Sequence, residues 1–214
     1  MHIRSIMTHS RPAAIVFTGS SRPMGPGDFI WLTALGCAAR GATTAEAVCA
    51  CIDTVASGQW APSPQLICDC LDEMARARHL DFSHDGRYSL FTITPQGRGI
   101  LAMMLALPVD RPTTPLGQVG LRLKLAFLDL APEEDRVSHL TDLIEIHARE
   151  LAGRPQTCAA CNAPGCFGRM WSDHHTDSLR RDLDLLRRML TISNSQTPGD
   201  GCSANGMRIN CISN

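Results

Sequence analysis

Hydrophobic and polar positions follow helical spacing in three short segments of the first third of the chain. Each segment follows a residue that suits an N-cap, namely Asp28, Thr43 or Thr44, and Ser63, the last with Pro64 in the first turn. Glycine or a Trp-Ala-Pro-Ser-Pro break separates the segments. The pattern predicts helices over residues 28–40, 44–57 and 63–77.

The hydrophobic period then changes from helical to alternating. Residues on both sides of Asp85-Gly86 alternate in character, which is the strongest short-range signal for a β-hairpin. Thr94-Pro95 next predicts the N-cap and first turn of a fourth helix that ends near Leu107. Three helices, a hairpin and a helix within residues 28–107 form the order of a winged helix. In helix-turn-helix proteins the recognition helix enters the major groove of DNA. Here it would be the third helix, with the hairpin as the wing.

A proline-rich linker over residues 108–115 predicts a domain boundary. Residues 116–130 fit a strand by their alternation, and they also fit a helix that is buried on most sides. Pro132 opens a clear helix with a coiled-coil stripe of Val137, Leu140, Ile144, His147 and Leu151. A last helix aligns Leu179, Leu183, Leu186 and Leu190. Residues 116–193 are therefore expected to form a helical dimerisation domain.

The two ends of the chain lack such periodicity. Residues 1–27 are rich in Ser, Pro and Gly and hold three arginines without an acidic residue, so we expect a flexible basic arm. Residues 194–214 are expected to be a disordered tail. The fold class predicted is mainly α with a small β-hairpin wing, an N-terminal winged helix-turn-helix followed by a C-terminal α-helical dimerisation domain.

Composition agrees with a globular chain, because 44% of the residues are hydrophobic and 19% are charged. No apolar run approaches the roughly 20 residues of a membrane span. The short apolar patch at residues 13–17 follows Arg11-Pro12 and does not fit a secretory signal. We therefore expect a cytoplasmic protein without a membrane partner.

The segment Trp60-Ala61-Pro62-Ser63-Pro64 resembles a signature of the PadR family of transcriptional regulators, in which an aromatic-x-Pro-Ser-Pro segment opens the recognition helix. Residues 88–97 resemble that family's wing strand and the Leu-Thr-x-x-Gly start of the next helix. Residues 124–132 and the helix after them are similar to its dimerisation region. The resemblance covers roughly residues 28–152 and 178–192.

The resemblance implies a homodimeric regulator, more often a repressor, that binds an inverted repeat in double-stranded DNA and responds to a small effector. It implies no catalytic residue, and we expect no enzyme activity. The DNA contacts that it implies are Ser63, Gln65, Leu66, Cys68, Arg76, His84 and Arg87. Trp60 and His147 are candidates for an effector pocket, although packing in the core is the better explanation of both.

Charge favours an alternative to DNA binding. Residues 28–107 hold five arginines and eight acidic residues, a net charge of −3. Gln65, Cys68 and Asp69 stand where the family usually has Gly and a Tyr-Pro pair. Phosphate contacts supply much of the affinity for DNA, so the arginines must gather on one face. The alternative is a winged-helix protein-interaction module that no longer binds DNA.

The ten cysteines fall into two groups of five, and the second group lies in surroundings rich in Gly, Pro and Asn: Cys158, Cys161, Cys166, Cys202 and Cys211. The first five lie in predicted helices, where cysteine usually serves as a small hydrophobic residue: Cys37, Cys49, Cys51, Cys68 and Cys70. A predicted Cys-rich loop over residues 153–171 carries Cys158-x-x-Cys161-x4-Cys166, followed by His174 and His175. These residue types suit a tetrahedral zinc site and, less well, an iron–sulfur site. A reversible Cys158–Cys161 disulfide and an incidental loop are the alternatives.

Overall fold

The computed structural model describes residues 22–86, 88–109, 111–154 and 165–195. Most of them are helical, and one two-stranded hairpin interrupts the helices. The elements are α1 (Pro26–Arg40), α2 (Ala45–Ala56), α3 (Pro64–Arg76), β1 (Leu80–Asp85), β2 (Tyr88–Ile93), α4 (Pro95–Ala106), α5 (Pro115–Phe127), the 3-10 turn η1 (Leu128–Leu130), α6 (Glu133–Ala152) and α7 (Cys166–Ser195). The fold class predicted from the sequence, mainly α with a small β-hairpin, is confirmed.

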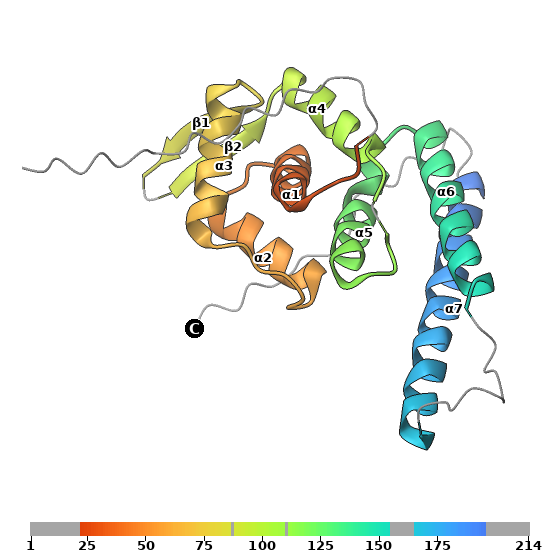
Figure 1. Cartoon of the computed structure of the whole chain (residues 1–214). Coiled ribbons are helices and arrows are strands. Elements are labelled where there is room, and N and C mark those ends of the chain that lie inside the picture. The colour runs from red at the N-terminus through yellow and green to blue at the C-terminus, as the bar shows by residue number, and fades with distance from the viewer. Residues whose placement is uncertain (1–21, 87, 110, 155–164, 196–214) are drawn as a thin grey trace, which may run out of the picture.

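Helix α1 forms the centre of the N-terminal part. Figure 1 shows it end-on, surrounded by α2, α3, α4 and α5. Ile30, Leu32 and Leu35 are fully buried, and nearly every residue between Asp28 and Ala38 is inaccessible to solvent. A helix that is covered on all sides is apolar all round, which explains why α1 has no polar stripe.

Three helices begin where the sequence predicts, because a hydroxyl side chain caps each of them. Thr44 accepts a hydrogen bond from the N–H of Ala47 at 3.2 Å, and Ser63 does the same for Leu66 at 3.2 Å. Thr94 caps α4 in the same way. Each cap satisfies an N–H that the first helical turn leaves without a partner.

The start of α1 corrects one prediction. Asp28 is not the N-cap, since the helix begins at Pro26 and Gly25 occupies the cap position. The Asp28 carboxylate reaches back to accept the Gly25 N–H at 2.8 Å and two hydrogen bonds from Arg22 at 2.6 and 2.7 Å. An acidic residue in the first turn stabilises a helix through both the hydrogen bond and the helix dipole.

The last residues of the predicted basic arm are also part of the fold. Met24 is buried, and its N–H donates to the carbonyl of Pro108 at 2.9 Å beside a parallel bridge to Val109. Residues 22–27 are therefore not a free arm. Residues 1–21 lie outside the described residues.

The hairpin has the predicted register and is tied to the core at its base. Strands β1 and β2 are antiparallel, with Leu80 opposite Ile93 and Asp85 opposite Tyr88. Thr43 and Phe91 exchange two backbone hydrogen bonds of 2.8 and 2.9 Å, which join β2 to the loop between α1 and α2. This contact fixes the direction in which the hairpin leaves the body.

Residues 116–130 resolve the ambiguity of the sequence in favour of a buried helix. Helix α5 packs against α1 and α2. Phe127 lies over Gly36 and Phe29 lies over Gly120, so close that a Cβ at either glycine would overlap the ring. The hydrophobic core therefore continues across the boundary expected at residues 108–115. The division into domains stays a prediction.

Helices α6 and α7 form an antiparallel pair beside this body (Figure 1). Their shared seam buries Leu140, Leu143 and His147 from α6 and Leu179, Leu183 and Leu186 from α7. Helix α7 begins at Cys166, so residues 166–171 are its first turns and not part of a loop, which corrects the predicted extent of the Cys-rich segment. Residues 194 and 195 end α7, and residues 196–214 lie outside the described residues. Among the helices described, none is long and apolar enough to cross a membrane.

The only lysine of the chain binds the end of α4 and interacts electrostatically with titratable groups of α6. Lys124 on α5 is buried, and its Nζ donates to the carbonyl of Leu107, the C-cap of α4, at 2.8 Å. Burial lowers the pKa of Lys124 to about 8, and the charge of Asp142 on α6 opposes that shift. The half-buried His139 of α6 lies close enough that the charge of Lys124 helps to lower the pKa of that imidazole, after the larger effect of burial.

The depressed pKa of Lys124 predicts a rise in stability with pH. Between pH 8 and about 10.5 the folded state holds a neutral amine while the unfolded chain still binds the proton, so alkali favours folding. We expect the free energy of unfolding to increase by up to about 3 kcal/mol across this window. Urea titrations at several pH values measure it, and Lys124→Met should flatten the curve. If the free energy of unfolding of Lys124→Met rose equally steeply with pH, Lys124 would not be the cause of the rise.

Candidate nucleic-acid interface

Helix α3 buries one face and leaves the other open to solvent. Ile67, Leu71 and Met74 pack into the core, at the spacing of a helix that lies on the body. The opposite face is exposed and consists of Gln65, Leu66, Cys68, Asp69, Asp72 and Arg76. This face has the length and accessibility of a helix that can enter a groove.

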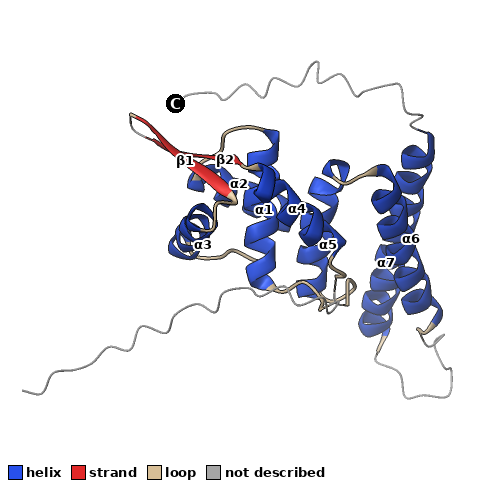
Figure 2. Ribbon diagram, turned by 90° about the horizontal axis from the view of Figure 1, so that it is seen from above, coloured by secondary structure: helices blue, strands red, loops and turns tan. Residues whose placement is uncertain are grey.

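The hairpin projects beside α3 at one end of the molecule. Figure 2 shows both elements on the side opposite the α6–α7 pair, and Figure 1 agrees from a second direction. The turn that links α3 to β1 is held by the carbonyls of Arg78 and His79, which accept hydrogen bonds of 2.7 and 3.1 Å from the hydroxyl of Thr94. The helix and the hairpin are thus set at a fixed angle to each other.

The candidate DNA contacts lie on this end wherever the structure describes them. Ser63 is exposed but its hydroxyl is engaged in capping α3, and Gln65 donates to the Asp69 carboxylate at 2.8 Å. Leu66 and Cys68 are exposed in the first two turns, and His84 is exposed near the tip of β1. Arg76 is exposed at the last turn of α3. Arg87 lies outside the described residues.

Charge on this end is divided along the length of α3. The first turn carries no acidic residue, whereas Asp69 and Asp72 occupy the exposed middle. Arg76 and Arg78 follow at the far end, both exposed. In helix-turn-helix proteins the N-terminal residues of the recognition helix contact base edges. The neutral first turn and the terminal arginines suit that geometry, and the central acids oppose it.

Two exposed aromatic residues on the wing were not singled out from the sequence. Phe82 is 52% exposed and its ring packs edge-on against His84, with centroids 5.2 Å apart, and Tyr88 is exposed opposite Asp85. Alternation placed Phe82 on the same face as the buried Leu80. The ring of Phe82 packs on one side against that of the buried Phe91, its cross-strand partner, with centroids 5.5 Å apart, and its other side is open to solvent.

The two candidate effector residues lie in different parts of the molecule. Trp60 is half-buried and packs edge-on against Phe29 of α1, with ring centroids 5.5 Å apart. His147 is fully buried on α6; its Nδ1 pairs with the Leu143 carbonyl at 2.8 Å, and its Nε2 has no partner among the described residues. The structure does not bring Trp60 and His147 into one pocket.

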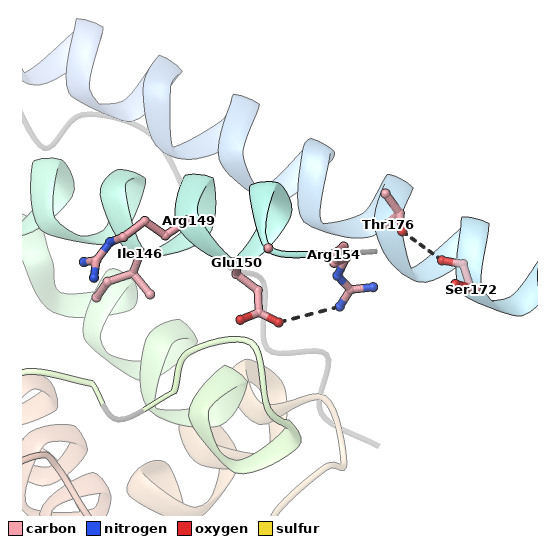
Figure 3. A pocket seen from close by; sticks show the side chains of 7 residues that line it. Ile146, Arg149, Glu150, Arg154, Ser172 and Thr176 are labelled. Atoms are coloured by element: carbon pink, nitrogen blue, oxygen red, sulfur yellow. Dashed lines mark hydrogen bonds and ion pairs between the residues drawn. The ribbon is translucent and has the colours of Figure 1, made fainter. Parts of the chain in front are cut away.

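Two cavities lie near these residues without including them. One of about 270 Å³ lies beside Phe29, where the start of α5 meets residues 24 and 109. The other, of about 570 Å³, opens between the end of α6 and the early turns of α7 (Figure 3). Its lining combines charged and polar side chains with one apolar side chain and a glycine, and consists of Ile146, Arg149, Glu150, Gly153, Arg154, Ser172 and Thr176.

The candidate metal or redox residues are only partly described. Cys158 and Cys161 lie outside the described residues. Cys166, His174 and His175 are all exposed on α7. Eight residues of helix separate Cys166 from His174, a rise of about 12 Å, so an intact α7 cannot present both to one ion. No group of three metal-ligating side chains occurs among the residues that the structure describes.

Residues 24–107 thus define a winged-helix protein with an appended helical pair. No protein-family model matches the chain, and no curated protein does. Solved structures similar to it include Bacillus subtilis PadR in complex with operator DNA, at 15% identity over 77% of this chain and 98% of that one, with a TM-score of 0.35. Bacillus subtilis PadR in complex with p-coumaric acid matches at 13% identity over 80% and 98%, with a TM-score of 0.36.

A PadR-like transcriptional regulator from Bacillus cereus is similar at 12% identity, over 78% of this chain and 99% of that one, with a TM-score of 0.35. All three structures are of the family that the sequence motifs resemble.

Proposed function

We propose that this chain is a transcriptional regulator that binds double-stranded DNA through α3 and the β1–β2 hairpin. The observation that carries the proposal is the open face of α3 beside a projecting hairpin, at the end of the molecule farthest from α6 and α7. A helix must be free along one side and about 10–12 Å wide to enter a major groove, and α3 meets both conditions.

Phosphate contacts would come from the arginines around this face. Arg22 and Arg40 are paired with Asp28 and Asp129, whereas Arg76 and Arg78 are exposed at the end of α3. Arginine at the edge of a groove neutralises phosphates and releases counterions. Because Asp69 and Asp72 lie between these arginines and the first turn of α3, we expect binding to be weak at high salt.

The test is an electrophoretic mobility shift with DNA from upstream of the chain's own gene. We expect retardation at low salt that weakens steeply as salt is added, with Arg76→Ala reducing the salt dependence by about one phosphate contact. No shift at micromolar protein in low salt would contradict the proposal. That outcome would favour a winged-helix module whose acidic face meets a protein partner.

A homodimer is the second part of the proposal. Phe167, Met170 and Trp171 are exposed at helical spacing on the first turns of α7, with Phe167 83% exposed. Apolar side chains that share one face in this way mark an interaction surface. A second copy would cover this patch and place two α3 helices on one duplex, as an inverted repeat requires.

Sedimentation velocity tests the dimer. We expect the full chain to sediment as a dimer, and the double substitution Phe167→Ser with Trp171→Ser to weaken association at least about tenfold, because buried aromatic residues dominate interfaces. Met103→Ser, which removes an exposed apolar side chain from α4, is the matched control. A monomeric wild-type chain, or equal association in all variants, would contradict the proposal that this patch is the dimer interface.

We further propose that the regulator represses transcription and that a small effector tunes it. A second form of tuning would act through Cys158, Cys161 and Cys166. Zinc bound there, or a reversible disulfide, would act at the connection between α6 and α7 and so change the spacing of the two α3 helices. Metal analysis of protein that was purified without a histidine tag tests the first form: less than a tenth of an equivalent of zinc or iron would count against it.

A further inference from the structure

A pair of cysteines lies in the seam between α1 and α2, outside every site described above. Cys37 is in the last turn of α1 and Cys51 is in the middle of α2, and the two helices pack side by side. Both side chains are half-buried against the core, so a small solute can reach them. Their thiols are near enough across the seam to affect each other's acidity through a thiol–thiol hydrogen bond. The pair therefore combines two neighbouring thiols with access from solvent.

A fixed cation completes the cluster. Arg40 lies one turn after Cys37, and its guanidinium donates to the carbonyl of Ala126 at 3.0 Å and to the Asp129 carboxylate at 2.8 Å. These bonds to the end of α5 and to η1 hold the positive charge near both thiols, where it favours a thiolate.

The two thiols have different acidities as a result. The hydrogen bond from Cys37 lowers the pKa of Cys51 to about 7, with burial opposing this shift and Arg40 supporting it. The same bond, together with burial, raises the pKa of Cys37, which keeps its proton. Cys49 differs from this pair, because burial, followed by the charge of Cys68 on α3, raises the pKa of its thiol.

We propose that Cys37 and Cys51 are a dithiol redox site that reacts with hydroperoxides and forms a reversible disulfide between α1 and α2. The Cys51 thiolate attacks the terminal peroxide oxygen and the O–O bond breaks. Cys51 becomes a sulfenic acid, and the other oxygen leaves as hydroxide or alkoxide and takes up a proton. The peroxide is reduced by two electrons from sulfur.

The second step forms the disulfide bond. Once Cys51 is a sulfenic acid, Cys37 no longer faces a thiolate, so the largest cause of its raised pKa is removed and only the smaller effect of burial still raises it. The Cys37 sulfur then attacks the Cys51 sulfur, the S–O bond breaks, and the hydroxyl leaves as water with the proton from Cys37. Two thiols and one hydroperoxide thus give one disulfide, one alcohol or water, and one water. An external dithiol reduces the disulfide by thiol–disulfide exchange and restores both thiols, while the dithiol itself becomes a disulfide.

Peptide mapping of the full wild-type chain tests the site and does not involve DNA. The reduced protein is treated with hydrogen peroxide, capped with iodoacetamide and digested with trypsin, which cleaves after Arg40 and Arg76. Cys37 is the only cysteine before Arg40, and Cys51 lies on the next peptide with Cys49, Cys68 and Cys70. We expect one cross-linked pair of these peptides, which dithiothreitol separates. Cys37 that is fully alkylated after peroxide treatment would overturn the proposal.

Variants and pH assign the partner of Cys37. Cys51→Ser should abolish the cross-link, whereas Cys49→Ser, on the same helix, should leave it unchanged; the opposite result would overturn the assignment. In wild-type protein, carboxymethylation of Cys51 should level off above about pH 8, because its thiolate is then nearly complete. A rate that continues to rise as for an ordinary thiol would equally contradict the proposal, and this readout needs no variant to fold.

Discussion

Leu66→Asp should strongly weaken specific DNA binding without unfolding the chain. Leu66 is 46% exposed in the first turn of α3, and its backbone N–H already bonds to Ser63. An acidic side chain in a first turn suits the helix dipole, so the free energy of unfolding should stay constant or rise slightly. On the DNA side, the new carboxylate would face base edges and phosphates, and we expect affinity to fall by roughly 100-fold.

The chain offers a closely matched control for this substitution. Leu116 is 47% exposed in the first turn of α5, which a threonine caps as a serine caps α3. Leu116→Asp adds the same charge at the same kind of helical position, away from α3 and the hairpin. Fluorescence anisotropy with labelled duplex should show near wild-type affinity for Leu116→Asp. Equal losses in both variants would mean that net charge, and not α3, governs binding.

The elements that sequence predicted well are those whose signals are local. Ser63-Pro64 and Thr94-Pro95 combine a capping hydroxyl with a residue whose fixed φ suits the first turn, and both helices begin there. Asp85-Gly86 between alternating residues gives the hairpin, with Gly86 at a φ of +56°. The open face of α3 follows from the same helical spacing, so most of the candidate interface could be placed in advance.

The elements that sequence left open depend on contacts between distant segments. Residues 116–130 alternate as a strand does, but α5 is a helix because both of its sides are covered, by α1 and by α2. Its glycines allow this, since Gly120 accepts the ring of Phe29. The sequence predicted Asp28 as the N-cap of α1, whereas it lies in the first turn and Gly25 is the N-cap. The bonds that Asp28 accepts from Gly25 and Arg22 form only once the chain is folded.

The candidate chemistry shows the same division. The spacing of Cys158, Cys161 and Cys166 drew attention to the C-terminal segment, whereas nothing in the sequence pairs Cys37 with Cys51 across 14 positions. That pairing arises from the packing of α1 on α2, and the nearby charge of Arg40 is held by residues almost 90 positions away. Lys124 is likewise unremarkable in the sequence, and its burial under the end of α4 sets its pKa.

Gly97→Ala should cause the largest loss of stability among the substitutions considered. Gly97 is buried in the first turn of α4, and a Cβ there would overlap the backbone carbonyl oxygen of His79, which cannot swing aside as a side chain can. The same carbonyl accepts hydrogen bonds from the N–H and hydroxyl of Thr94. Relief of the overlap would move α4 away from the turn between α3 and β1 and break the Thr94 bonds.

We expect this change to reduce the free energy of unfolding by at least about 3 kcal/mol, which for a chain of this length lowers Tm by roughly 6–12 °C. Gly99→Ala is the control, because Gly99 lies half a turn away on α4 with open space around it. Alanine there should stabilise the helix by up to about 1 kcal/mol. Thermal and urea unfolding followed by circular dichroism measure both.

The pair of variants also links stability to the interface. Since His79 lies in the turn that sets the hairpin beside α3, the displacement expected in Gly97→Ala should weaken DNA binding even at temperatures where the variant remains folded. Gly99→Ala should bind DNA as the wild type does. A Gly97→Ala protein that equals Gly99→Ala in both stability and affinity would show that the contact between α4 and the α3–β1 turn does not fix the geometry of the wing.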